Sequence, residues 1–132
     1  MGKAIAQQNS IHISPRKAGL ICDLIRFKST NEALSILTNL DKKGSEIILK
    51  LLKSAISNAT HNHALDATKL YVLQALANQA KMIKRTMPKA RGSAALIRKR
   101  HSNIIIIVSD NQSDRLPVKK SKKPVARKEL TK

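Results

Sequence analysis

Aromatic, cysteine and acidic residues are scarce in this sequence, and each shortage excludes a class of function. The 132 residues include one Phe, one Tyr and no Trp, so there is no aromatic platform on which unpaired bases could stack. The single cysteine, Cys22, excludes an internal disulfide and fits a reducing compartment. Only 8 Asp and Glu oppose 26 Lys and Arg, and the net charge is +18. A compact fold with this charge repels itself, so we expect a polyanion as partner.

Long hydrophobic runs are also absent. The longest aliphatic run is Ile104–Val108, whereas a membrane-spanning helix needs roughly twenty residues, so we expect no insertion into a membrane. The first residues, MGKAIAQQNS, lack the apolar core of a signal peptide. Ala6 stands where a myristoylation motif requires Ser or Thr. These features predict a cytosolic protein.

The basic residues concentrate in an acid-free part of the chain. Residues 67–109 contain no carboxylate side chain, and residues 84–100 carry seven Lys or Arg in seventeen positions. A solvated surface usually mixes both signs of charge, so this segment predicts a surface that lies against phosphates. Because aromatics are few, recognition through phosphate contacts and RNA shape fits better than the reading of unpaired bases.

Three helices are predicted in the first half of the chain. The first begins near Pro15 with Ser14 as its cap. Its apolar face consists of Ala18, Ile21, Cys22 and Ile25. The second follows Ser29, which has capping-box spacing to Glu32. The third and longest spans about residues 41–62, where apolar residues recur at helical spacing over more than three turns.

The second half of the chain predicts a hairpin. Residues 103–110 favour a strand because they contain four consecutive isoleucines, whereas residues 69–86 fit a helix by propensity and a strand by alternation. The nearest partner for the clear strand precedes a turn at residues 88–92. Paired arms at 69–86 and 95–109 would each reach roughly 50 Å, beyond the roughly 13 Å radius of a small domain. Such a hairpin would project from the protein.

Catalytic chemistry has few candidates. Cys22 lies on the apolar face of the first helix, where a small buried side chain is the simpler interpretation. His61 and His63 lie just past the long helix without a third metal ligand. With no glycine-rich phosphate loop or zinc-ribbon spacing, we expect no enzyme, cofactor or metal. Arg16 and Lys17 stand in the first turn of a helix, where an anion is preferred; they either bind a phosphate or extend into solvent.

Four segments of the chain resemble the family of large-subunit ribosomal protein twenty-two, namely ISPRKAGLICDLIR, LLKSAISNATHNHALD, LYV and MIKRTMPKARGSAALIRKRHSNIIIIVSD. The resemblance runs from about Ile13 to Asp110. It implies an α+β fold with three helices packed on an antiparallel sheet and a long protruding β-hairpin. It also favours a strand from about Lys69. Residues 1–112 would form one globular domain, with the hairpin at about 69–109 and its tip at about 87–95. Residues 113–132 have no hydrophobic period and predict a basic, disordered tail.

The resemblance implies a structural constituent of the large ribosomal subunit that binds ribosomal RNA, aids assembly and lines the nascent-peptide exit tunnel with its hairpin. The protein would be a monomer within a cytoplasmic ribosome, beside neighbouring large-subunit proteins and the nascent polypeptide; an organellar ribosome stays open. Carried over by position, the RNA-binding residues would be Ser14, Arg16, Lys17, Asn58, His61, His63, Lys81, Lys84, Arg85, Lys89, Arg91, Arg98, Lys99 and Arg100. The tunnel-lining tip would consist of Met87, Pro88, Lys89, Ala90, Arg91, Gly92 and Ser93.

The sequence departs from this family near both ends of the hairpin. Ser93, Ala94, Ala95 and Leu96 replace a charged run, and Asn103 stands where a histidine is common. The alternative interpretation is an architectural DNA-binding protein with basic β-arms. Such proteins usually dimerise, and the sequence shows no clean dimer interface. An RNA-modifying enzyme would need a cofactor loop or a converging acid-base set, and the sequence shows neither.

Overall fold

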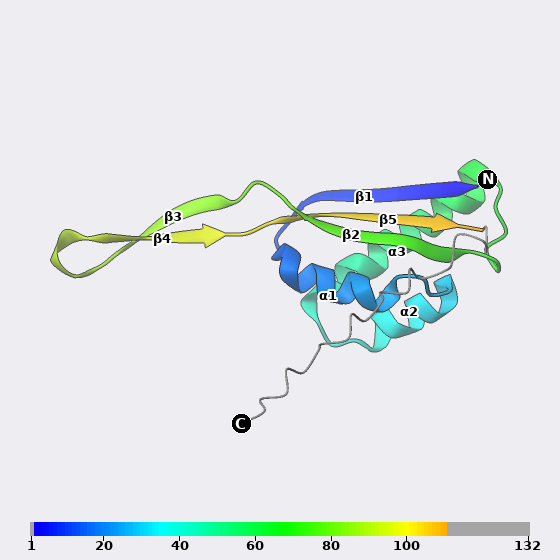
Figure 1. Cartoon of the computed structure of the whole chain (residues 1–132), viewed down its shortest axis with the longest axis horizontal. Coiled ribbons are helices and arrows are strands. Elements are labelled where there is room, and N and C mark those ends of the chain that lie inside the picture. Colours follow the sequence, from blue (N-terminus) through cyan, green and yellow to red (C-terminus); the bar gives the residue numbers. More distant parts are fainter. Residues whose placement is uncertain (1, 111–132) are drawn as a thin grey trace, which may run out of the picture.

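A layer of three helices covers one face of a three-stranded sheet, and a two-stranded ribbon extends far beyond that sheet (Figure 1). These features come from a computed structural model, which describes residues 2–110. The predicted α+β class with a protruding hairpin is confirmed. The predicted basic tail at 113–132 lies outside the described residues.

The three predicted helices are all present. α1 spans Pro15–Ile25 and buries the four residues of its predicted apolar face. α2 spans Thr30–Asn39, and the Ser29 hydroxyl accepts a hydrogen bond from the Glu32 N–H at 3.3 Å, as the capping-box spacing predicts. α3 spans Lys43–His63 and supplies the longest buried stripe to the core.

The sheet has the strand order β1-β5-β2, and the central strand is antiparallel to both neighbours. β1 spans Lys3–Ile11, β2 spans Tyr71–Gln79 and β5 spans Ser102–Ser109. The ambiguous segment is therefore a strand. β1 is the one strand of this sheet for which no prediction was made from the sequence. That strand exists because its backbone pairs with β5, from Lys3 opposite Ser109 to Ile11 opposite Ser102.

The core lies between the sheet and the helices. Ile104, Ile106 and Val108 alternate along β5, and all three are fully buried under the helical layer. Gly44 allows the start of α3 to approach α1 closely, since a Cβ atom at this position would lie 2.7 Å from Ile21 Cδ1. This close approach shapes a groove between the two helices.

The predicted arms of the hairpin are divided into two separate sheets. β3 (Ile83–Pro88) pairs with β4 (Ala94–Lys99), and the chain leaves regular strand structure at residues 80–82 and 100–101. The first arm begins at Tyr71 rather than Lys69, because the Lys69 N–H donates to the Asp66 carbonyl in a turn, at 3.1 Å. We use "ribbon" for β3, β4 and the turn that joins them, and "root" for the two breaks where the ribbon meets the sheet.

Candidate nucleic-acid interface

The ribbon has no second layer of protein against either face. Every residue of β3 is exposed, and in β4 only Ala95 and Ile97 are half-buried. An isolated two-stranded ribbon is at best marginally stable in water, because nothing buries its faces. Both faces are therefore open to a partner along the whole length of the ribbon (Figure 1).

The strand register distributes the cations over both faces. Directly opposed residues of an antiparallel pair lie on one face, and successive residues of a strand alternate between faces. Arg85 and Lys99 therefore lie on one face of the ribbon. Lys84 and Arg98 are directly opposed and lie on the other. A partner that touched only one face would leave half of these charges without a counterion.

The Lys84–Arg98 pair is unfavourable within the isolated chain. Like charges directly opposed across two strands destabilise a sheet. No carboxylate occurs in residues 67–109, so the ribbon carries no internal counterion for this pair. The pair therefore favours an anionic partner, and a phosphate group is an anion that accepts hydrogen bonds from both Lys and Arg.

The tip is a tight turn with two residues in the left-handed region. A short 3₁₀ turn, Ala90–Gly92, joins the strands, and φ is 56° at Arg91 and 71° at Gly92. A non-glycine residue in this conformation costs about 1 kcal/mol. The Ser93 hydroxyl donates to the Ala90 carbonyl at 2.9 Å, and the Lys89 N–H donates to the Ser93 carbonyl at 2.8 Å. The Ser93 side chain therefore stabilises the turn. Residues 87–93 are all exposed.

A histidine that the sequence analysis did not single out holds the root together. His101 is buried, and its Nε2 lies 2.6 Å from His12 Nδ1. Its Nδ1 lies 3.1 Å from the Lys99 carbonyl, and its own carbonyl accepts from the Ala80 N–H at 3.0 Å. A carbonyl oxygen only accepts, so His101 Nδ1 carries a proton; with both rings neutral, His12 donates to His101. Because 89 positions separate the two histidines, no local pattern could have predicted the contact.

The Asn103 side chain adds a hydrogen bond beside the root. The Asn103 side-chain oxygen accepts a hydrogen bond from the Ser10 N–H at 2.8 Å. Ser10 has a φ of 55° and lies where the register of β1 shifts. Asn103 therefore accepts a hydrogen bond from the Ser10 N–H, which the register shift of β1 leaves out of the pairing with β5. Lys81 and Arg100 flank this region and are both exposed.

A second group of predicted residues lies at the start of α1. Arg16 and Lys17 are exposed in its first turn, which contains no acidic residue. Ser14 occupies the cap position but makes no side-chain capping bond. This end of the helix therefore combines a positive dipole with two cations, which is the arrangement that favours an anion.

The third group lies at the far end of α3 from the ribbon (Figure 1). His61 and His63 are exposed in the last turn of the helix, so the prediction that they lie just past it was wrong. The Asn58 amide donates to the Ile5 carbonyl at 3.1 Å and thereby ties β1 to α3. The structure thus separates the predicted residues into three regions: the ribbon with its root, the start of α1 and the end of α3.

The remaining chemical candidates serve the core. Burial raises the pKa of the Cys22 thiol from 9.0 to about 11, which keeps the sulfur protonated and unreactive at neutral pH. Across residues 2–110, no cluster of three or more His, Cys, Asp or Glu could hold a metal ion. In the same range, no helix has the length and apolar character needed to span a membrane.

The fold and the ribbon together define a class of small basic α+β proteins that project a cationic two-stranded arm from a helix-covered sheet. The sequence profile of the family described as Ribosomal protein L22p/L17e matches residues 6–109. The chain belongs to this family. The expectation of a structural protein rather than an enzyme is confirmed by this membership.

Three similar proteins support the assignment, each of them named large ribosomal subunit protein uL22. That of Mycoplasmoides gallisepticum is 56% identical over 85% of this chain and 78% of its own length. That of Malacoplasma penetrans is 55% identical over 86% of this chain and 84% of its own length. That of Mycoplasma pneumoniae is 45% identical over 96% of this chain and 80% of its own length. The similarity therefore covers both the helical layer and the ribbon.

Proposed function

We propose that the ribbon is an arm that ribosomal RNA encloses and holds through phosphate contacts. Family membership makes the chain a structural constituent of the large ribosomal subunit, in the cytoplasm of bacteria such as its relatives. The observation that carries the finer proposal is the presence of cations on both faces of an uncovered ribbon. RNA on one face alone would neutralise only half of them, so RNA segments lie on both sides.

This arrangement gives the protein a role in assembly. An arm with phosphates on both faces connects RNA segments that would otherwise repel one another. The shortage of aromatic residues supports recognition of RNA shape and backbone over stacking of unpaired bases. The RNA stabilises the ribbon, and the ribbon in turn stabilises the arrangement of the RNA segments around it. Binding and folding of this part of the subunit are therefore coupled.

The predicted contacts outside the strands belong to the same proposal. At the globular end, Ser14, Arg16 and Lys17 contact RNA at the start of α1, and His61 and His63 do so at the end of α3. The Asn58 side-chain amide already donates one hydrogen bond to the Ile5 carbonyl. Asn58 would therefore contact RNA through its remaining side-chain N–H or its side-chain oxygen. The residues that flank the root and complete the ribbon contacts are Lys81, Lys89, Arg91 and Arg100.

The tip reaches the nascent-peptide exit tunnel in this proposal. The resemblance to the family implies this position, and the exposure of residues 87–93 supports it. Met87, which is 46% exposed, and the left-handed turn at Arg91 and Gly92 would face the nascent polypeptide.

Removing the opposed cations tests the phosphate contacts. In the K84A/R98A variant, the salt dependence of binding to large-subunit ribosomal RNA should fall by roughly 1 to 2 in slope, since each phosphate contact contributes about 0.7 to 0.9. A matched K50A/K53A variant removes two exposed cations from α3, and its slope should stay at the parental value. Equal slopes for the two variants would contradict phosphate contacts on the ribbon.

Sedimentation tests the place of the protein in the cell. In a sucrose gradient of lysate, the chain should remain in the large-subunit fraction after a high-salt wash, because an enclosed arm cannot leave without unfolding the RNA around it. Release into light fractions by the wash would contradict enclosure. Co-migration with DNA would favour the architectural DNA-binding alternative.

A further inference from the structure

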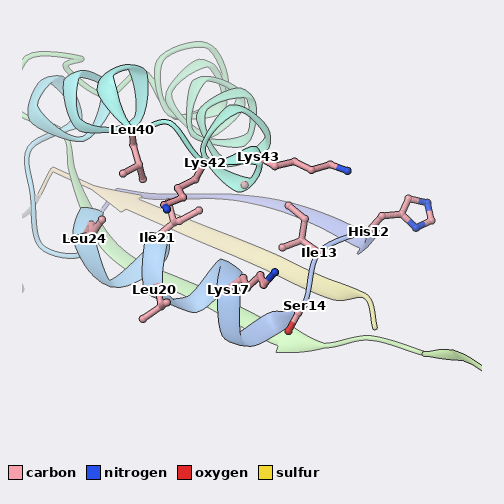
Figure 2. Close-up of a pocket in the computed structure, with 11 residues that line it drawn as sticks. His12, Ile13, Ser14, Lys17, Leu20, Ile21, Leu24, Leu40, Lys42 and Lys43 are labelled. Carbon is pink, nitrogen blue, oxygen red and sulfur yellow. The ribbon is translucent and has the colours of Figure 1, made fainter. Parts of the chain in front are cut away.

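A groove of about 550 Å³ lies between α1 and the segment that joins α2 to α3 (Figure 2). Its apolar lining comes from Ile13, Leu20, Ile21, Leu24 and Leu40. Figure 2 shows the side chains of Ile21 and Leu40 extending toward each other from opposite sides of this space. The groove is near the ribbon root but belongs to the helical layer, so it is distinct from the charged surface of the ribbon.

Two exposed leucines extend the apolar surface of the groove. Leu20 is 67% exposed and Leu24 is 49% exposed. They stand one helical turn apart on α1 and therefore share one face of the helix. Apolar surface of this kind, next to a hollow, marks an interaction site. Phosphates and riboses cannot replace the water on aliphatic side chains favourably, so RNA does not suit this surface.

The charge at the rim specifies the partner further. Lys17, Lys42 and Lys43 line the groove, and no acidic residue does. Two carboxylates adjoin lining residues along the chain, Asp23 and Asp41; both are exposed, and neither is part of the lining. An apolar floor with a cationic rim complements a segment that has apolar side chains on one face and carboxylates beside them.

We propose that this groove docks an acidic amphipathic helix of a neighbouring protein. Aliphatic side chains of that helix insert between Leu20, Leu24 and Leu40, in the helix-in-groove manner. Its carboxylates pair with Lys42 and Lys43 of the rim. The inference rests on the proposed function, because the neighbour is another component of the large subunit. It assigns a protein partner to the apolar floor of this groove, beside the RNA contacts proposed for the start of α1, the end of α3 and the ribbon.

Photo-crosslinking in purified large subunits tests the proposal. Leu20 is replaced with p-benzoylphenylalanine, which its exposure tolerates, and a second full-length protein carries the same group at Thr86 on the ribbon. After irradiation, we expect the residue 20 probe to attach to a protein segment rich in Leu, Ile, Asp and Glu, as read by mass spectrometry. We expect the residue 86 probe to attach to RNA.

A charge-matched pair of variants separates docking from general attraction to a basic protein. K42Q/K43Q, which removes two lysines that line the groove, should lower the protein adduct of the residue 20 probe about tenfold. K50Q/K53Q, which removes two lysines of α3 outside the groove, should leave the adduct yield unchanged.

The outcomes distinguish the two proposals. An adduct from residue 20 to RNA, to a basic protein segment, or to nothing would overturn the docking proposal. If residue 86 still attached to RNA, the proposed function would stand in each of those cases. If residue 86 attached to no RNA, or the chain were absent from the subunits, the proposed function would fall and the docking proposal with it.

Discussion

At the scale of single residues, Cys22 links folding to pH. Its thiol is buried in α1, and burial raises its pKa from 9.0 to about 11 because the core solvates a thiolate poorly. Below pH 9 the thiol is protonated in the folded and unfolded states alike. Between about pH 9 and 11 the unfolded chain ionises first, so the contribution of the thiol to stability is lost as pH rises through this window.

The prediction is a steeper alkaline loss of stability in the parent than in Cys22→Ala. A thiol pKa raised from 9.0 to about 11 corresponds to roughly 2 to 3 kcal/mol of unfolding free energy at full ionisation. Lysines titrate in the same range in both proteins, so the difference between their urea-unfolding curves isolates the thiol. Parallel pH profiles would show that the thiol ionises equally well in the folded state.

At the scale of elements, the ribbon root is stabilised by one buried side chain. His101 joins three segments: its ring contacts His12 before α1 and the Lys99 carbonyl in β4, and its backbone accepts from Ala80. The ribbon itself adds no buried core, so these bonds decide how firmly the arm is attached to the sheet.

Replacing His101 with Leu should loosen the root while preserving its volume. We expect a loss of about 1 to 2 kcal/mol in unfolding free energy, because the ring bonds to His12 and Lys99 disappear, and faster hydrogen exchange at the Ala80 amide. His61→Leu is the matched control, since His61 is exposed in the last turn of α3. Equal stability and exchange in both variants would mean that the histidine pair does not secure the root.

At the scale of the whole molecule, the net charge of +18 opposes the compact state. The Lys84–Arg98 pair adds to this repulsion, because the two cations are directly opposed and residues 67–109 contain no carboxylate to neutralise them. The groove between α1 and α3 carries a smaller excess of the same sign. The net charge, the opposed cations and the groove therefore all favour surroundings that supply negative charge.

Sodium chloride should accordingly stabilise the isolated protein. As ionic strength rises from about 0.01 to 0.1 M, the Debye length falls from about 30 to 10 Å and the repulsion is screened. We expect the melting temperature to rise by a few degrees, since about 1 kcal/mol corresponds to roughly 2 to 8 °C in domains of about 60 to 250 residues. A melting temperature independent of sodium chloride would show that the charges are too widely spaced to repel.

The sequence alone determined the features that contiguous residues encode. Helical periodicity placed α1, α2 and α3, and the Ser29 cap followed from its spacing to Glu32. The isoleucine-rich strand and the turn at residues 88–92 predicted a projecting hairpin, and the acid-free basic segment predicted its charge. The quoted motifs identified the family that the comparisons confirm.

Tertiary structure alone decided what depends on residues far apart in the chain. β1 became a strand by pairing with β5, and the pairing register alone set Lys84 opposite Arg98. The contact of His12 with His101 and the groove between α1 and α3 each require segments that meet only after folding. The physical reason is that periodicity and charge are local properties, whereas register, burial and the shape of a cavity arise from packing between elements.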